Sequence, residues 1–453
     1  MIERGGAASE TDENILDEDS AELLATTEPV SPSEAALARH RESLRRPRLV
    51  YASVVSVVVV ALLVVVTVAW SRGEVANTAL HTVPKTQAPA SLAIAAPTPS
   101  PQVAWRTGDR SAIGVPQWGG TVVVWSKHTV RGLDARTGRQ TWSYARSNRT
   151  VCTAAQAGGT TVAIYQVNGN CDEVTAVDSQ TGTRRWTRTL DMDGLPVYGQ
   201  PTYQVLSFTV MVTTPSVIYA IDPVSGYNRW TFRMQGCTIN RAVLGSTGAL
   251  ISQFCAKPEC GKLTFCGRGA QVLLRDGIAG SDDKSDTNPD KLKWNSIGDT
   301  DLPVSADAVV STLDPTTRTL NTLNPGSGKS AGAVALAPFP TATDPIVATA
   351  ASGTEVIWLG GVVYAVRTGS PAPIWAAKAP SPPTVASTTG EDSPDLSTAR
   401  VTLPTATGIR LLDGNDGHTA QSFPVTPPAP GSLVYSLGTG FLVAGPDGTV
   451  AYR

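Results

Sequence analysis

Two patterns of hydrophobic residues divide the chain. Residues 49–70 form an apolar run of 22 residues without a charge, which is long enough to cross a hydrocarbon core of about 30 Å as a helix. Beyond residue 102, short apolar stretches alternate with turns rich in Gly, Asp and Pro, a pattern typical of β-strands. The chain is therefore predicted to hold one transmembrane helix at 49–70 and an all-β domain at 102–453.

Arginine residues flank the apolar run unequally. Five lie closely before it and one lies directly after it. Because bases accumulate on the cytoplasmic side of a membrane span, we expect a single-pass protein of the cell membrane, with a cytoplasmic N-terminus and everything after Trp70 outside. A cleaved signal peptide is the alternative interpretation, but the 48 residues before the run exceed a usual n-region.

Two polar segments border the predicted helix. Residues 1–48 carry 11 acidic residues and 6 arginines, a composition that predicts a disordered acidic cytoplasmic tail, either a solubilising leader or a segment that recruits a cytoplasmic partner. Residues 71–101 are rich in Pro, Ala and Thr. We expect them to form an extended spacer that packs against nothing.

A repeat with a period of 44 residues follows. Its three strong copies read VRGLDARTGRQTW at 130–142, VTAVDSQTGTRRW at 174–186 and IYAIDPVSGYNRW at 218–230. Each copy has an apolar strand ending in Asp, a Gly four residues later and a Trp four residues after that. Asp can bond the backbone of a turn, and Gly supplies the positive φ that short hairpin loops need. The repeat therefore predicts β-hairpins and not a catalytic motif.

Weaker copies extend the repeat toward the C-terminus. They include LNTLNPGSG at 320–328, VVYAVRTGSPAPIW at 362–375 and IRLLDGNDG at 409–417. The last strand, 448–453, has no successor and the strand around Trp105 has no predecessor, so we expect these two strands to pair. Residues 102–453 number 352, which gives eight units of 44. The prediction is an eight-bladed β-propeller of four-stranded blades, closed by the Trp105 strand.

The Asp-x-x-x-Gly-x-x-x-Trp pattern after an apolar strand resembles the PQQ-like repeat of quinoprotein-type propellers. That family includes pyrroloquinoline-quinone (PQQ) dehydrogenases and a non-catalytic outer-membrane assembly lipoprotein. The Ala- and Val-rich sequence with its acidic tail is also similar to envelope propellers of actinobacteria. The resemblance implies that the repeated Trp packs between neighbouring blades. The residues in this position are Trp105, Trp142, Trp186, Trp230, Trp294 and Trp375.

All six cysteines follow the predicted membrane span, an even number that suits disulfides in an oxidising compartment. The expected pairs are Cys152–Cys171, Cys237–Cys255 and Cys260–Cys266. The repeat places the first two pairs within single blades, each joining the first strand to the end of the second. Zinc is not predicted, because the spacing offers no second short pair of ligands.

Several motifs imitate chemical sites. GSGKS at 326–330 lacks the first Gly of a phosphate-binding loop. Its Ser330 lies at a predicted hairpin turn, whereas a hydrolase nucleophile would need a strand-to-helix turn. His128 and His418 lie in distant blades. The acidic loop Asp282–Asp290 lacks the Gly and distal Glu of an EF-type loop, so a solvated loop is favoured over a calcium site. No catalytic, cofactor-binding or metal-binding residue is predicted.

Three functions remain open. The first is a non-catalytic, membrane-tethered propeller that acts as a binding or scaffold module in the cell envelope, with an envelope protein or a cell-wall polymer as partner. The second is a transmembrane sensor that signals through the acidic tail. The third is a PQQ-dependent dehydrogenase, but the alcohol-oxidising members of that family carry adjacent cysteines and this sequence has none. A net charge of −2 does not indicate nucleic-acid binding. We favour the first function, without enzyme activity or cofactor.

Overall fold

In the computed structural model, the chain divides into two compact units, Met1–Ser71 and Arg72–Arg453. The structure describes residues 34–93, 95–114, 117–191, 201–206, 209–256, 267–276, 292–307, 309–337, 347–351, 353–386 and 400–453. Cys260, Cys266 and the loop Asp282–Asp290 lie outside the described residues.

The first unit contains helix α1 (Glu34–Arg72). Within it, Ser53–Ser71 has a mean hydropathy of 2.8 and is not buried. By length and composition this stretch is a candidate membrane span. The helix begins before the predicted span, so the prediction of a disordered tail is wrong for residues 34–48. Ala, Leu, Glu and Arg, which dominate those residues, are good helix formers.

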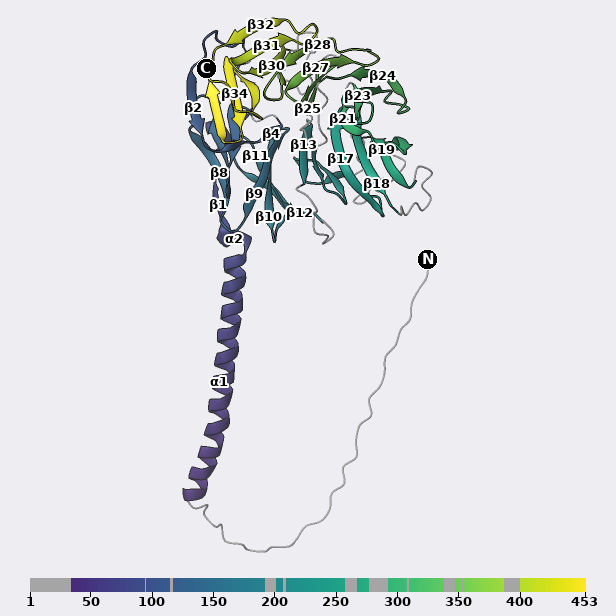
Figure 1. Cartoon of the computed structure of the whole chain (residues 1–453). Coiled ribbons are helices and arrows are strands. Elements are labelled where there is room, and N and C mark those ends of the chain that lie inside the picture. Colours follow the sequence, from purple (N-terminus) through teal and green to yellow (C-terminus); the bar gives the residue numbers. More distant parts are fainter. Residues whose placement is uncertain are drawn as a thin grey trace, which may run out of the picture. The chain divides into compact units, whose positions relative to one another are not determined.

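The second unit is a propeller of eight sheets, each of which is one blade (Figure 1). Blade 1 contains β3 (Arg110–Ser111), β5 (Gln117–Trp118), β6 (Thr121–Trp125), β7 (Thr129–Asp134) and β8 (Gln140–Arg146). Blade 2 contains β9 (Thr150–Ala157), β10 (Thr160–Val167), β11 (Asn170–Asp178) and β12 (Arg184–Thr189), and β4 (Ile113–Gly114) pairs in parallel with β9. Blade 3 contains β13 (Thr202–Leu206), β14 (Thr209–Thr213), β15 (Ile218–Ile221) and β16 (Asn228–Phe232).

The next four blades follow the same order of strands. Blade 4 contains β17 (Cys237–Gly245), β18 (Gly248–Cys255), β19 (Gly269–Arg275) and β20 (Leu292–Ile297). Blade 5 contains β21 (Leu302–Ala306), β22 (Val310–Asp314), β23 (Thr319–Leu323) and β24 (Ser330–Ala335). Blade 6 contains β25 (Val347–Ala351), β26 (Thr354–Leu359), β27 (Val362–Arg367) and β28 (Trp375–Lys378). Blade 7 contains β29 (Thr384–Ala386), β30 (Arg400–Thr405), β31 (Gly408–Asp413) and β32 (Thr419–Phe423).

Blade 8 closes the ring with strands from both ends of the domain. It contains β33 (Leu433–Leu437), β34 (Gly440–Gly445), β35 (Gly448–Tyr452) and β2 (Val103–Thr107). β2 pairs with β35 so that Trp105 lies opposite Ala451, and Figure 1 shows β2 beside the yellow C-terminal strands. The predicted eight-bladed fold, and its closure by the Trp105 strand, are therefore confirmed.

The described hydrophobic core consists of eight clusters, one between each pair of neighbouring blades. In β6, Val122 and Val124 pack against blade 8, whereas Val123 packs against blade 2. Successive side chains of a strand point to opposite faces, so each blade contributes to two clusters. We call the contact between two neighbouring blades a seam and number it by its blades, as in seam 1–2.

Residues 74–101 belong to the folded propeller unit, and the prediction that the spacer packs against nothing is wrong. This segment contains α2 (Glu74–Asn77), β1 (Thr78–His81) and the 3-10 helix η1 (Lys85–Gln87). β1 pairs with β8 as a further strand on the edge of blade 1. We call residues 74–93 and 95–101 the strap. Their composition predicted extended backbone, but it does not reveal which sheet edge that backbone meets.

Candidate functional site

Each strong copy of the repeat forms a turn that a Trp of the preceding blade holds in place. In blade 2, Asp178 Oδ1 accepts hydrogen bonds from the backbone N–H groups of Gln180 and Thr181, both at 3.0 Å. Trp142 of blade 1 donates its indole N–H to Ser179 O at 2.9 Å. The same bond runs from Trp105 to Ala135 O, from Trp186 to Pro223 O, from Trp294 to Pro325 O and from Trp375 to Gly414 O. We call this arrangement the Trp clasp.

The turn Gly is part of the Trp clasp. Gly182 has a φ of 71°, and a Cβ at this position would lie 2.7 Å from the Trp142 side chain. A larger residue would meet both left-handed backbone strain and the indole ring. This double requirement explains why Gly stays four residues after the Asp. The Trp230 ring lies 4.5 Å from the guanidinium carbon of Arg275 in blade 4, a cation–π contact.

The first two predicted disulfides are present. Cys152–Cys171 lies in blade 2 and Cys237–Cys255 lies in blade 4. The second joins the first strand to the end of the second, as predicted. The strand assignment of the first is wrong, because β10 ends at Val167 and Cys171 belongs to the third strand, β11. A turn at Asn168 and Gly169, both with positive φ, separates the two strands.

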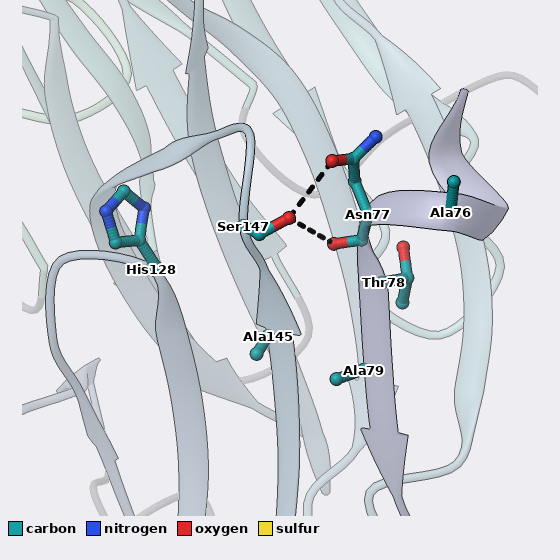
Figure 2. Close-up of a pocket in the computed structure, with 7 residues that line it drawn as sticks. All are labelled: Ala76, Asn77, Thr78, Ala79, His128, Ala145 and Ser147. Atoms are coloured by element: carbon teal, nitrogen blue, oxygen red, sulfur yellow. Dashed lines mark hydrogen bonds between the residues drawn. The ribbon is translucent and has the colours of Figure 1, made fainter. Parts of the chain in front are cut away.

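The strap begins against the outer edge of blade 1. Ser147 donates its backbone N–H to Asn77 O at 2.9 Å and its hydroxyl to Asn77 Oδ1 at 3.0 Å. An open pocket of about 370 Å³ lies here, lined by Ala76, Asn77, Thr78, Ala79, His128, Ala145 and Ser147 (Figure 2). His128 is the titratable side chain of this lining, and its Nδ1 bonds Arg149 O. The contacts of Asn77 hold the strap against blade 1. The residues that line the pocket contain no pair of groups for acid–base catalysis.

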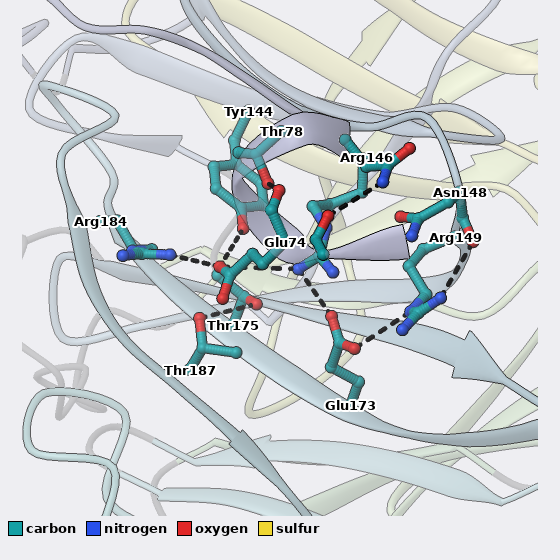
Figure 3. A network of polar contacts seen from close by, with 12 residues as sticks. Glu74, Thr78, Tyr144, Arg146, Asn148, Arg149, Glu173, Thr175, Arg184 and Thr187 are labelled. Carbon is teal, nitrogen blue, oxygen red and sulfur yellow. Dashed lines mark hydrogen bonds and ion pairs between the residues drawn. The ribbon is translucent and has the colours of Figure 1, made fainter. Parts of the chain in front are cut away.

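An ion network joins the strap to blades 1 and 2 (Figure 3). Glu173, on β11 of blade 2, pairs with Arg146 Nη1 at 2.7 Å and with Arg149 Nε at 3.1 Å. Glu74 of the strap pairs with Arg184 and lies 3.7 Å from Arg146 Nη1. The Arg146 side chain is 3% exposed, and a buried cation without a partner is strongly destabilising. The positive charge of Arg146 therefore connects the strap, blade 1 and blade 2.

The electrostatics of this network keep Arg146 charged. Burial lowers the pKa of its guanidinium, but the hydrogen bond to Tyr144 and the negative charges of Glu173 and Glu74 outweigh burial, so the pKa is raised overall. The guanidinium carbon also lies 6.0 Å from the centre of the Tyr165 ring. No sequence pattern marks these residues, since their contacts connect distant segments of the chain.

The strap continues from blade 2 to blade 8. Val83 donates its backbone N–H to Thr181 O, in the turn of blade 2, at 3.0 Å. Thr98 donates its backbone N–H to Thr439 O in blade 8 at 2.9 Å, and Leu92 packs into seam 8–1. The strap thus binds three consecutive blades beside the strands that close the ring.

Two polar groups of the described residues that imitate chemical sites lie at turns of the blades. Ser330 begins β24, directly after a turn in which Asn324 Oδ1 accepts two backbone N–H groups. In the part of the chain that the structure describes, one group could hold a metal ion, formed by Asp413, Asp416 and His418. Asp413 Oδ1 accepts the backbone N–H of Asn415, and Asp416 Oδ1 bonds His418. The turn of blade 7 therefore accounts for this acidic group.

Two features of the chain bear on a bound quinone with calcium. The adjacent cysteines of the alcohol-oxidising quinoproteins are absent from the sequence. The described cysteines bond partners 19 and 18 residues away, and the candidate metal ligands already serve a turn. No chemical step is assigned to such a group. The propeller fold by itself is shared by binding modules and enzymes.

Part of the sequence resembles a known protein family. Residues 91–197, which include the end of the strap and blades 1 and 2, match a family model described as outer membrane protein assembly factor BamB. The chain carries PQQ-like repeats. No curated protein matches the sequence.

Solved structures with a similar fold cover most of the chain. BamB from Moraxella catarrhalis is 13% identical, with a TM-score of 0.47 over 78% of this chain and 99% of that chain. The computationally designed Ika8 protein is 12% identical, with a TM-score of 0.48 over 77% and 98%. The quinohemoprotein alcohol dehydrogenase from Comamonas testosteroni is 12% identical, with a TM-score of 0.46 over 78% and 76%.

Proposed function

We propose that this protein is a non-catalytic, membrane-tethered propeller that acts as a binding or scaffold module in the cell envelope. In this proposal α1 anchors the chain in the cell membrane, the N-terminus is cytoplasmic and the propeller lies outside. The partner is another envelope protein. The observation that carries the proposal is the bound strap, which follows directly after the apolar helix in the sequence.

The strap gives the propeller a defined end of attachment. One residue, Gly73, separates α1 from α2 in the sequence. The chain enters the propeller at Asn77 beside Ser147, and the neighbouring Arg146 donates its backbone N–H to His128 O in the turn between β6 and β7. The Asp–Gly turns lie at the opposite end of the blades, because antiparallel strands place successive turns at alternating ends. At that end the strap bonds the turn of blade 2 through Val83, and in this proposal the turn of blade 3 contacts the partner.

One Asp–Gly turn carries an exposed apolar pair. In blade 3, Val224 is 46% exposed and Tyr227 is 70% exposed, whereas the same positions of blade 1 hold two arginines. Trp186 and Arg188 of blade 2 bond the carbonyls of this turn, so the pair stands on a rigid support. Aromatic anchors on rigid supports dominate many protein interfaces. We therefore select this pair as the candidate contact.

A crosslinking experiment in living cells tests the proposal. A photoreactive amino acid replaces Tyr227 in one version of the full chain and Lys127, an exposed residue at the attached end, in the other. We expect position 227 to capture a defined envelope protein and position 127 not to capture it, with Val224→Arg abolishing the product. Capture from position 127 alone would refute the choice of face, and no product from either position would argue against a protein partner.

The orientation has a separate test. External protease applied to intact cells or spheroplasts is expected to digest the chain beyond Trp70 and to leave the N-terminal tail intact. Two disulfides in the propeller are consistent with an oxidising compartment. A propeller that is protected until the membrane is permeabilised would contradict the orientation.

An activity assay separates the scaffold from the dehydrogenase. The purified full chain in detergent is mixed with pyrroloquinoline quinone and calcium, and dye-linked oxidation of alcohols and sugars is recorded. We expect background rates. Quinone-dependent turnover that a chelator abolishes would replace this proposal with the dehydrogenase.

A further inference from the structure

Seam 5–6 differs from the other seams at one repeat position. This position lies on the second strand of each blade, opposite the third-strand residue that precedes the Asp–Gly turn or its equivalent. In the other seven blades it holds Val122, Thr161, Val210, Ala249, Val310, Val401 and Phe441. In blade 6 it holds Glu355, opposite Val366. An ionisable side chain therefore stands where the repeat places an uncharged one.

Glu355 is buried inside the hydrophobic seam. It shares a face of β26 with Ile357 and Leu359, which pack in the core between blades 5 and 6, and it is 0% exposed. Its Oε1 accepts the hydroxyl of Ser311 from blade 5 at 2.9 Å. Its Oε2 is buried and accepts no hydrogen bond from the residues that the structure describes. An ionised carboxylate in this position would be strongly destabilising.

The charges around Glu355 favour its neutral form. The pKa of Glu355 is raised to about 8, mainly by burial. Hydrogen bonds from the hydroxyls of Ser311 and Ser305 lower this pKa, and the negative charge of Asp307 raises it. Asp307, from blade 5, itself accepts the backbone N–H of Ser246. Arg367 directs its Nε to Thr354 Oγ1 at 3.2 Å, and among the described residues no base forms an ion pair with Glu355.

Seam 5–6 also lacks a Trp clasp in its described residues. Gly332 pairs with Thr322 on β23, the position that Trp142 occupies opposite Gly132 in blade 1. A Cβ at Gly332 would lie 3.0 Å from Gly369 Cα of blade 6, so the two backbones meet closely without an aromatic ring between them. The hydrophobic cluster of this seam is accompanied by described hydrogen bonds from the Ser311 hydroxyl to Glu355, from the Gly369 backbone N–H to Thr322 Oγ1 at 3.2 Å, and from the Tyr364 hydroxyl to Ala337 O.

We propose that seam 5–6 is a proton-controlled joint of the ring, in which protonated Glu355 keeps blades 5 and 6 packed and loss of its proton to solvent loosens them. In the closed seam the Glu355 carboxyl keeps its proton. In the opened seam the hydrated carboxyl loses this proton when the pH is above its ordinary pKa of 4.5. Because the folded pKa is the higher one, the stability from this group is lost as pH rises. The opening equilibrium increases by up to about tenfold per pH unit between about pH 4.5 and pH 8, and it levels off above that range.

Hydrogen–deuterium exchange of the full chain in detergent tests the joint. Exchange is measured at pH 6 and pH 8 and corrected for the intrinsic amide rate. In the wild type we expect amides of β22 and β26 to open up to about 100-fold more at pH 8, while β6 and β10 of seam 1–2 serve as an internal reference without this change. Glu355→Gln should abolish the pH dependence in β22 and β26, because its amide does not titrate.

A second variant keeps the test valid if the first does not fold. Glu355→Val restores the residue type of Val122, Val210 and Val310 at this repeat position and should also remove the pH dependence. A Gln or Val variant that keeps the wild-type pH dependence in β22 and β26 would overturn the proposal. Equal pH dependence in β6 and β10 would overturn it as well. Neither result depends on the partner or on the orientation proposed above.

Discussion

Seams 1–2 and 5–6 join the same kind of repeat unit with different chemistry. In seam 1–2, Trp142 donates to Ser179 O and the buried Arg146 pairs with Glu173. In seam 5–6, Gly332 stands in the Trp position and Glu355 bonds Ser311. Both seams have a hydrophobic cluster. The repeat therefore determines the backbone of each blade, whereas a few residues at each seam determine how strongly two blades hold together.

The position of the strap sharpens this difference. It binds blades 8, 1 and 2, and the two described disulfides lie in blades 2 and 4. Among the described residues, the strap contacts and both disulfides thus lie in blades 8, 1, 2 and 4, and not in blades 5 and 6. In repeat proteins, stability is approximately a sum of unit and interface terms, so uneven seams should give uneven local stability. Seams 1–2 and 5–6 provide the contrast to test.

The largest expected effect comes from opening the ring itself. Deleting residues 102–107 removes β2 and the Trp105 clasp, and it leaves β35 as an unpaired sheet edge. We expect the cooperative unfolding transition to be lost and the protein to aggregate, as read by thermal melts and size-exclusion chromatography. A deletion variant as stable as the parent would mean that closure does not depend on β2.

Replacing the Trp of the strong seam should have the next largest effect. Trp142 is fully buried, so Trp142→Ala leaves a cavity and an unbonded carbonyl at Ser179. The expected loss is about 4 kcal/mol in the free energy of unfolding, measured by urea denaturation of the full chain in detergent. Tyr227→Ala, at an exposed position, is the matched aromatic control and should change stability by less than about 0.5 kcal/mol. Equal effects of the two variants would show that the clasp does not hold seam 1–2.

The sequence predicts the strong seams better than the weak one. Trp142, Gly182 and their repeats keep a fixed spacing because each turn must bond its own backbone and meet an indole ring. Those requirements are local to the repeat, so they are visible without a structure. Glu355 has no such signature, since its burial depends on β26 facing blade 5.

The strap shows a second limit of sequence reasoning. Its Pro-, Ala- and Thr-rich composition predicts extended backbone, and the strap contains the strand β1 beside the short helices α2 and η1. Backbone hydrogen bonds such as those between β1 and β8 can be made by almost any residue, so the composition does not reveal the pairing. Glu74 and Arg146 lie far apart in the sequence, so no local pattern reveals their contact. The error in the first disulfide has a local cause, because the turn at Asn168 and Gly169 ends β10 before Cys171.

Removing the disulfide of blade 2 tests whether covalent reinforcement contributes to the stronger side of the ring. The Cys152→Ala, Cys171→Ala double variant opens a loop of 19 residues, for which a loss of about 3 kcal/mol is expected. The measurement is the shift in the thermal and urea transitions. The same change at Cys237 and Cys255, which close 18 residues in blade 4, is the matched comparison and should cost about as much. A much smaller loss in blade 2 would mean that the strap and the ion network make its disulfide redundant.

The smallest expected effect distinguishes the charge of the strap from its backbone pairing. Glu74→Gln removes the carboxylate that pairs with Arg184 and lies near Arg146, but the Glu74 side chain is 35% exposed and solvent screens its charge. Arg146 keeps its closer partner, Glu173. We therefore expect a loss of about 0.5 kcal/mol at low salt that disappears at about 1 M salt, where the Debye length is about 3 Å. Lys85→Gln, an exposed strap residue, is the control and should have no effect at either salt concentration. A loss that salt does not reduce would show that Glu74 acts through packing, and a loss of several kcal/mol would place it with Glu173 as an essential partner of the buried arginine.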